Sequence, residues 1–144
     1  MTKKTDEVLG QDWVKEFLAR PLLARLGTAN PKNAQPHVTP VWFAWDGECL
    51  YISAFVSTRK GKEVTANQRI SVLVDVDNPT YAVLLEGVAE VLTEPAEVEK
   101  RSESIYARYV GAEAVKGDPY QSWARDPENR IIKLRPARAY AWRW

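Results

Sequence analysis

The dipeptide Asp46-Gly47 lies between two runs rich in β-branched and aromatic residues, 38–45 and 48–55. Asp-Gly is a favoured two-residue loop of a β-hairpin, so we expect the two runs to pair as antiparallel strands, with Val41 opposite Ile52. Because side chains alternate along a strand, both faces of this hairpin would be mainly apolar. One face belongs in a core, and the other needs a cover, which could be a flat ligand, a second subunit, or both.

Apolar patterning predicts the other elements of the chain. Helices are expected at 13–18, 59–67 and 95–110, the last capped by the hydroxyl of Thr93, and a short one around 120–125. The remaining strand-like segments are 22–29, 69–76, 81–92 and a last strand around Pro136.

These elements describe a mainly β fold with peripheral helices. About six strands, most of them joined as hairpins, are typical of a small six-stranded antiparallel β-barrel. The chain has 144 residues and contains no internal repeat or low-complexity linker. We therefore expect residues 1–144 to form a single domain.

Composition excludes several classes of function. The net charge of +1 gives no general attraction for nucleic acid. One cysteine, Cys49, and one histidine, His37, argue against disulfides and against a metal centre. No apolar run approaches the roughly 20 residues that a membrane-spanning helix needs, and the charged N-terminus lacks a signal-peptide core. These features predict a cytoplasmic protein with no nucleic-acid or membrane partner.

Four polar residues, Ser57-Thr58-Arg59-Lys60, follow the second run of the predicted hairpin and begin a predicted helix. The first turn of a helix has N–H groups without intrahelical partners, and the helix dipole favours an anion there. Hydroxyl and cationic side chains at the same place add further phosphate ligands. An exposed helix start is the alternative interpretation.

The order of these segments resembles one known family. The segments are Pro36-His37-Val38-Thr39-Pro40-Val41-Trp42-Phe43, Leu50-Tyr51-Ile52-Ser53, Ser57-Thr58-Arg59-Lys60, Arg69-Ile70-Ser71-Val72-Leu73-Val74, Glu86-Gly87-Val88-Ala89-Glu90-Val91 and Lys133-Leu134-Arg135-Pro136. Together they resemble the pyridoxamine 5′-phosphate oxidase-like split barrels, a superfamily of flavin- and deazaflavin-binding oxidoreductases. The resemblance runs from about Leu22 to Trp142.

The resemblance implies a split β-barrel that forms a homodimer, with FMN at the subunit interface. It implies that hydride passes through the flavin to or from a small-molecule substrate, with no catalytic residue identified. The implied cofactor-binding residues are Val38, Thr39, Pro40, Val41, Trp42 and Phe43 along the ring and ribityl chain, Ser53 and Ala54 near the ribityl phosphate, Thr58, Arg59 and Lys60 at the phosphate, and Trp142 from the partner subunit.

Two departures from the family pattern narrow the function. Authentic pyridoxamine phosphate oxidases carry a C-terminal motif with histidine, whereas the single histidine here is His37, so the chain is not expected to be a true pyridoxamine phosphate oxidase. The common pattern Asn-Leu-Arg-Arg-Asp-Pro is replaced by residues 63–68, Glu-Val-Thr-Ala-Asn-Gln. The loss of two arginines favours compact FMN over coenzyme F420 with its anionic tail.

Other functions stay open at this point. An F420-dependent reductase would use the same pocket. A non-catalytic flavin- or haem-binding protein would share the fold without the reaction. An oligonucleotide-binding barrel is a further alternative, because aromatic side chains on a β-surface can stack on bases, although the near-neutral charge opposes it.

Overall fold

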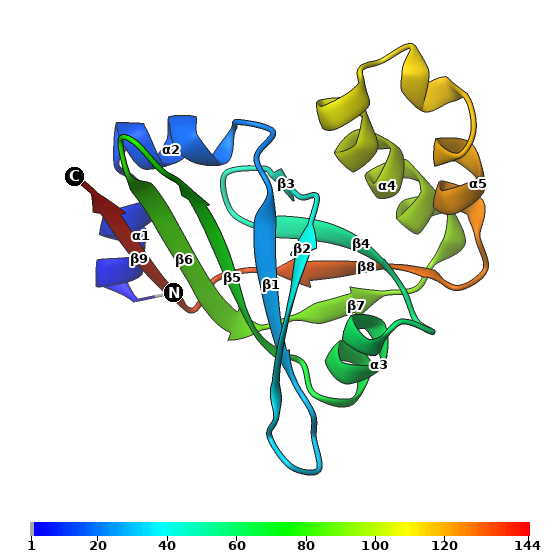
Figure 1. The fold of residues 1–144 in the computed structure, drawn as a ribbon, viewed down its shortest axis with the longest axis horizontal. Coiled ribbons are helices and arrows are strands. Elements are labelled where there is room, and N and C mark those ends of the chain that lie inside the picture. The colour runs from blue at the N-terminus through cyan, green and yellow to red at the C-terminus, as the bar shows by residue number, and fades with distance from the viewer. Residues whose placement is uncertain (1) are drawn as a thin grey trace.

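Two antiparallel sheets form the centre of the protein in a computed structural model, which describes residues 2–144 (Figure 1). The larger sheet has the strand order β2-β1-β5-β6-β9, and the smaller one β3-β4-β8-β7. The strands are β1 (Ala24–Ala29), β2 (Pro36–Val41), β3 (Ala44–Trp45), β4 (Leu50–Phe55), β5 (Arg69–Val76), β6 (Tyr81–Val88), β7 (Glu90–Leu92), β8 (Asn129–Leu134) and β9 (Arg138–Arg143).

The predicted class, a mainly β antiparallel split barrel with peripheral helices, is confirmed, but the described chain has nine strands and not six. Three long β-runs each cross from one sheet to the other and break at the crossing. The breaks separate β2 from β3, β6 from β7, and β8 from β9. At Ala89, for example, the backbone N–H leaves the ladder and donates to the Gln68 carbonyl at 2.7 Å.

The predicted register of the hairpin is wrong by two residues. Trp45 pairs with Leu50, which leaves a four-residue turn instead of a two-residue loop. The cause is Asp46, whose carboxylate accepts hydrogen bonds from the N–H groups of Glu48 and Cys49 at 2.9 and 2.7 Å. Only β3 continues the hairpin with β4. Strand β2 pairs with β1 instead, so that Val41 lies opposite Ala24 and not opposite Ile52.

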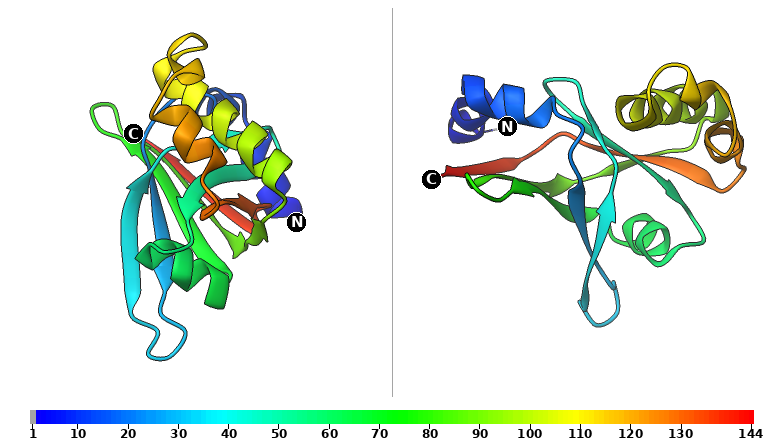
Figure 2. Two further views of the ribbon diagram at one scale, coloured as in Figure 1. Left: turned by 90° about the vertical axis from the view of Figure 1, so that its right-hand side faces the viewer. Right: turned by 45° about the horizontal axis from the view of Figure 1, so that its top comes forward.

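The helices lie at the two ends of the sheets (Figures 1 and 2). One end carries α1 (Lys3–Leu9) and α2 (Asp12–Leu18), and the other carries α4 (Pro95–Val110), the 3₁₀ turn η1 (Ala114–Lys116) and α5 (Tyr120–Arg125). Helix α3 (Arg59–Ala66) follows β4 and contacts β1. None of the helices in residues 2–144 is long and apolar enough to cross a membrane.

Helix α1 was not predicted from the sequence, because its composition is charged. It is fixed by its polar residues: the Thr2 hydroxyl caps it by accepting from the N–H of Thr5, and the Thr5 hydroxyl donates to the carbonyl of Ala137 at 3.0 Å. The predicted cap of α4 also needs correction. The carboxylate of Glu94, not the hydroxyl of Thr93, accepts from the first free N–H groups of that helix.

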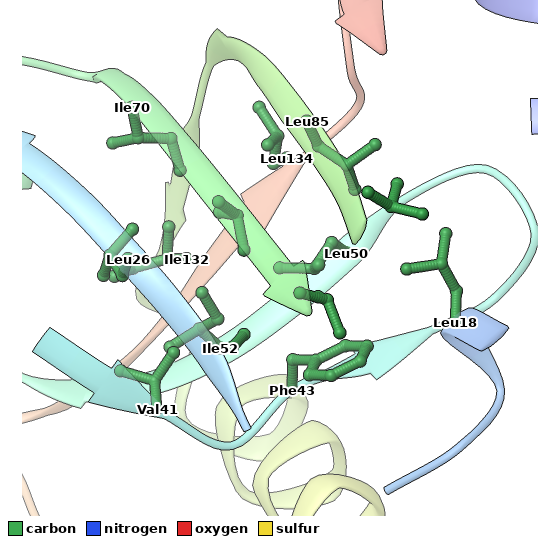
Figure 3. Close-up of a cluster of buried hydrophobic side chains, with 14 of the residues drawn as sticks. Leu18, Leu26, Val41, Phe43, Leu50, Ile52, Ile70, Leu85, Ile132 and Leu134 are labelled. Atoms are coloured by element: carbon green, nitrogen blue, oxygen red, sulfur yellow. The ribbon is translucent and has the colours of Figure 1, made fainter. Parts of the chain in front are cut away.

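The apolar side chains form two clusters. The first fills the barrel between the sheets, where Phe43, Leu50 and Ile52 are fully buried (Figure 3). The second lies between the opposite face of β4 and helices α4 and α5, and includes Cys49 and Tyr51. The outer face of the hairpin, expected to need a ligand or a subunit as cover, is therefore covered in large part by helices of the same chain.

Candidate functional site

A cavity of about 500 Å³ lies where β2 and β4 meet the start of α3 and the helices α4 and α5. Its lining is mainly apolar, with a few hydroxyl groups and a lysine. The lining residues are Leu23, Pro40, Val41, Trp42, Ser53, Ala54, Phe55, Thr58, Lys60, Ile105, Tyr106 and Trp123. This volume is within the range of small-molecule sites, and an apolar wall with few polar groups is their usual composition.

The start of α3 forms the cationic part of the cavity. Thr58 caps the helix: its hydroxyl accepts from the N–H of Gly61 at 3.2 Å and donates to the carbonyl of Phe55 at 2.7 Å. The N–H groups of Arg59 and Lys60 lie in the first turn, where helix geometry gives them no intrahelical acceptor. Lys60 lines the cavity, so the start of α3 can offer an anion both backbone donors and a charge.

Gly61 allows α3 to begin so close to the end of β4. A Cβ atom at this position would lie 2.1 Å from the carbonyl oxygen of Phe55. No side chain fits at that separation, because the neighbouring atoms belong to the backbone. The position of Lys60 beside β4 therefore depends on a glycine at position 61.

Arg59 forms an ion pair with Glu63 and does not line the cavity. The Nε of Arg59 lies 3.3 Å from the buried carboxylate of Glu63, which also accepts a 2.8 Å hydrogen bond from the hydroxyl of Thr28. The hydrogen bond from Thr28 is the main reason that the pKa of Glu63 lies below its ordinary value, and Arg59 lowers it further. These contacts join α3 to β1, and they hold Arg59 outside the cavity lining.

Aromatic side chains from α4, from α5 and from Trp42, which directly follows β2, meet at one wall of the cavity. Trp42 stacks on Tyr109 with ring centroids 4.6 Å apart and planes 4° from parallel. Tyr106 makes edge-on contacts with both Trp42 and Trp123, with ring centroids 6.3 and 6.1 Å apart. Trp123 is 40% exposed, so this wall opens to solvent at α5.

Hydroxyl and amide groups form a network that begins at this wall, with Ser53 and Tyr106, and continues behind it, with Ser102 and Asn129. The hydroxyl of Ser53 lies 2.8 Å from the Tyr106 hydroxyl and donates to the side-chain oxygen of Asn129 at 2.8 Å. The amide nitrogen of Asn129 donates to the hydroxyl of Ser102 at 2.8 Å. Burial raises the pKa of Tyr106, so its phenol stays protonated at neutral pH.

Seven of the twelve sequence-predicted site residues come together in this cavity. They are Pro40, Val41, Trp42, Ser53, Ala54, Thr58 and Lys60. The other five lie outside its lining: Val38, Thr39, Phe43, Arg59 and Trp142. Phe43 is fully buried in the barrel core, and its backbone N–H and carbonyl are occupied by Tyr109 and Arg108. Trp142 lies on β9, at the opposite edge of the larger sheet from β2.

Sequence reasoning missed the contribution of α4 and α5. It interpreted 95–110 as a covering helix without chemistry, yet Ile105 and Tyr106 of that helix line the cavity, as does Trp123. A tyrosine on the apolar face of a helix was the available signal, because a buried phenol needs a hydrogen-bond partner.

A second, larger hollow of about 670 Å³ lies on the outer face of the five-stranded sheet. Polar and charged side chains contribute to it, including Arg69, Glu86 and Arg138. None of the twelve predicted site residues lies in its lining. The smaller cavity is therefore the candidate site.

The two sheets and the cavity are those of a split-barrel protein with a small-molecule site. The sequence places the chain in one family with this fold. The sequence profile of the pyridoxamine 5′-phosphate oxidase family matches residues 11–143. The chain belongs to this family. A comparison with the curated proteins finds no match.

Solved structures support the same fold. A structure named F420 reductase is 29% identical, with a TM-score of 0.72, and the match covers 88% of this chain and 94% of that one. The flavocytochrome Anf3 from Azotobacter vinelandii is 22% identical, with a TM-score of 0.76, over 93% of this chain and 67% of that one. A conserved hypothetical protein from Mycobacterium tuberculosis is 23% identical, with a TM-score of 0.75, over 99% and 85%.

Proposed function

We propose that this protein is an FMN-binding oxidoreductase and that its single domain holds the flavin in the cavity between β2, β4 and α4. One observation carries the proposal: the same cavity joins an anion-binding helix start, with Thr58 and Lys60, to an apolar wall that contains Trp42. A flat ring with a phosphate tail matches this combination. Membership of the family and the names of two similar structures, an F420 reductase and a flavocytochrome, support it.

The residues present fit such a cofactor in size and in chemistry. The cavity volume of about 500 Å³ accommodates a small-molecule ligand, and the cavity walls are mainly apolar. Thr58 and Lys60 would hold the phosphate together with the free N–H groups of the first turn of α3. Pro40, Val41 and Trp42 would lie along the ring.

A bound flavin supplies hydride transfer, while the protein supplies binding, orientation and electrostatics. In this chain Lys60 neutralises phosphate charge, and its role is in binding. The side chains of Leu23, Val41 and Ile105 give the cavity apolar walls. The substrate in this proposal is a small molecule that approaches from the exposed side of the aromatic wall, beside Trp123.

Coenzyme F420 is the second candidate cofactor, because the similar F420 reductase covers most of the chain at 29% identity. Its anionic tail would need cations beyond the phosphate site. In α3, the side chain of Glu63 is buried against Thr28, and Thr65 donates to the carbonyl of Gly61. Neither position offers a positive charge to such a tail, which favours FMN.

A homodimer is part of the proposal. Val38 and Trp142 are 63% and 42% exposed, although both are large apolar residues. The strand registers place them on the same outer face of the five-stranded sheet, with Leu73, Leu84 and Tyr140 between them. A second copy of the chain seated on this face would cover them and could bring its Trp142 to the cofactor.

The visible spectrum of the purified protein tests the cofactor assignment. We expect a flavin spectrum, with FMN identified by mass spectrometry of the molecule released on denaturation. The double variant Arg59→Ala/Lys60→Ala should lose the flavin and keep its circular dichroism spectrum. A deazaflavin or haem spectrum would instead support the alternatives, and undiminished flavin retention in the double variant would refute the phosphate site.

A further inference from the structure

The network beside the cavity fixes the direction of the hydrogen bonds that join Asn129, Ser53 and Tyr106. Ser53 and Tyr106 line the cavity, whereas Ser102 and Asn129 lie behind them, 0% and 2% exposed. The amide of Asn129 has its hydrogen-bond partners in Ser53, Ser102 and the carbonyl of Ala124.

The orientation of the Asn129 amide follows from its neighbours. One side-chain atom of Asn129 lies 3.3 Å from the backbone carbonyl oxygen of Ala124. A carbonyl oxygen only accepts, so this atom must be the NH₂ group and not the amide oxygen. The amide oxygen then faces Ser53.

The protons of the two hydroxyl groups follow in turn. The amide oxygen of Asn129 cannot donate, so the one proton of Ser53 must go to it. The hydroxyl of Tyr106 lies 2.8 Å from the same Ser53 oxygen and must therefore be the donor in that pair. With its proton committed to Ser53, the Tyr106 oxygen can only accept, from the hydroxyl of Ser102 or from a ligand.

We propose that Tyr106 is a specificity-determining residue, and that the cavity selects ligands which present an N–H or O–H donor to its oxygen. The proposal deepens the proposed function and rests on it in taking this cavity as the ligand site. A flavin satisfies the requirement through the imide N–H of its ring. A ligand with only carbonyl, nitro or ether oxygens at this place does not.

Binding of an acceptor-only ligand would cost the network one hydrogen bond. To donate to an acceptor-only ligand, Tyr106 would have to release Ser53, whose oxygen would keep only the long 3.4 Å contact from Ser102. One neutral hydrogen bond exchanged in this way corresponds to a preference of about 3- to 10-fold for the donor ligand.

Two isosteric probes measure this preference directly. Indole presents a ring N–H donor, and benzofuran has the same shape with an acceptor oxygen in its place. Dissociation constants of both are measured by NMR titration of the protein, without flavin, and compared as a ratio. We expect indole to bind about 3- to 10-fold more tightly than benzofuran. Tyr106→Phe should abolish the preference.

Asn129→Ala gives a prediction that a merely structural role would not make. Without the amide oxygen, the proton of Ser53 can turn to Tyr106, which then becomes free to donate to a ligand. The preference for indole should fall or reverse, although Asn129 does not line the cavity. Ser102→Ala is the matched control, because Ala124 still orients the amide of Asn129 and the preference should persist.

The outcomes separate this proposal from the proposed function. Equal or tighter binding of benzofuran to the wild-type protein, or no measurable binding of indole, overturns the proposal, whether or not FMN binds. Failure of FMN to bind a protein that prefers indole refutes the flavin assignment alone. If Asn129→Ala does not fold, Tyr106→Phe, which loses a single oxygen, still decides the question.

Discussion

The hydroxyl of Tyr109, on α4, accepts a 3.0 Å hydrogen bond from the N–H of Phe43 and donates to the carbonyl of Leu22 at 2.8 Å. Phe43 marks the place where the chain leaves the larger sheet for the smaller one, and Leu22 precedes β1. The phenol of Tyr109 thus joins α4 to the crossing segment at Phe43 and to the segment before β1, and its stacking on Trp42 holds the aromatic wall of the cavity.

Tyr109→Phe should therefore destabilise the protein. The substitution leaves the N–H of Phe43 and the carbonyl of Leu22 without this partner, which costs about 1–3 kcal/mol in the free energy of unfolding. Urea denaturation measures the loss. Tyr81→Phe is the matched control, because no hydrogen bond of the Tyr81 hydroxyl occurs within residues 2–144. Equal stability of the two variants would contradict the fastening role of Tyr109.

The buried carboxylate of Glu63 should make stability depend on acid pH. Its folded-state pKa lies below its ordinary value, chiefly because Thr28 donates to the charged form. Such a group stabilises the folded state above its unfolded pKa, and the contribution is lost as the pH falls through the folded pKa. Urea midpoints should fall as the pH drops through the ordinary pKa range of a glutamate and on through the lower folded-state pKa, and less steeply in Glu63→Gln than in the wild type.

Asp46 also has a lowered pKa, so the acid dependence in Glu63→Gln should be reduced and not abolished. Burial works against this lowering, but the hydrogen bonds from the N–H groups of Cys49 and Glu48 outweigh it. A variant Glu63→Gln with an unchanged pH profile would show that the Thr28 hydrogen bond does not favour the charged carboxylate.

Gly61→Ala tests the close approach of α3 to β4. The added methyl group would lie 2.1 Å from the Phe55 carbonyl oxygen, so the helix must move or the protein must lose stability. We expect a loss of about 1–3 kcal/mol, measured by thermal or urea unfolding. Gly117→Ala is the control, because a Cβ atom at position 117 would lie 3.7 Å from the carbonyl oxygen of Ala114, an ordinary contact distance. Similar stability of both variants would place α3 further from β4.

A charged residue on the outer face of the large sheet tests the dimer. Val38→Glu places a carboxylate on the edge strand β2, at one side of the proposed subunit contact, and the protein should become monomeric in light scattering while its circular dichroism is unchanged. Glu90→Lys, an exposed position on the short strand β7 of the other sheet, is the control. A wild-type protein that is already monomeric would refute this contact.

The sequence predicted the elements better than their connections. The strand 69–76 was predicted at its observed bounds, because its residues are β-branched and flanked by turns. The hairpin register was wrong, because the turn is shaped by the side chain of Asp46 and not by the Asp-Gly backbone preference. The pairing of β2 with β1 instead of β4 could not be predicted from the local pattern, because the alternation of side chains along β2 is compatible with either partner.

In the candidate site, too, the residues could be predicted from the sequence, whereas their tertiary contacts could not. Lys60, Ser53 and the segment 40–42 were predicted together from the order of the motifs, and the structure brings them into one cavity. The different places of Arg59 and Lys60 depend on Glu63, one helical turn away, whose burial against Thr28 is a tertiary contact. Periodicity indicates that Tyr106 lies on the apolar face of its helix, but only the packing of α4 on β4 brings it to the cavity.

The affinity of the protein for FMN in two lysine variants tests the central claim most directly. Lys60 lines the cavity and Lys62, on the same helix, is exposed and outside it. Titration of the flavin-free protein, followed by flavin fluorescence, should show about 10- to 100-fold weaker binding in Lys60→Ala, because a charge-assisted phosphate contact is lost. Lys62→Ala should bind FMN like the wild type. Equal affinities in all three proteins would contradict a flavin phosphate at the start of α3.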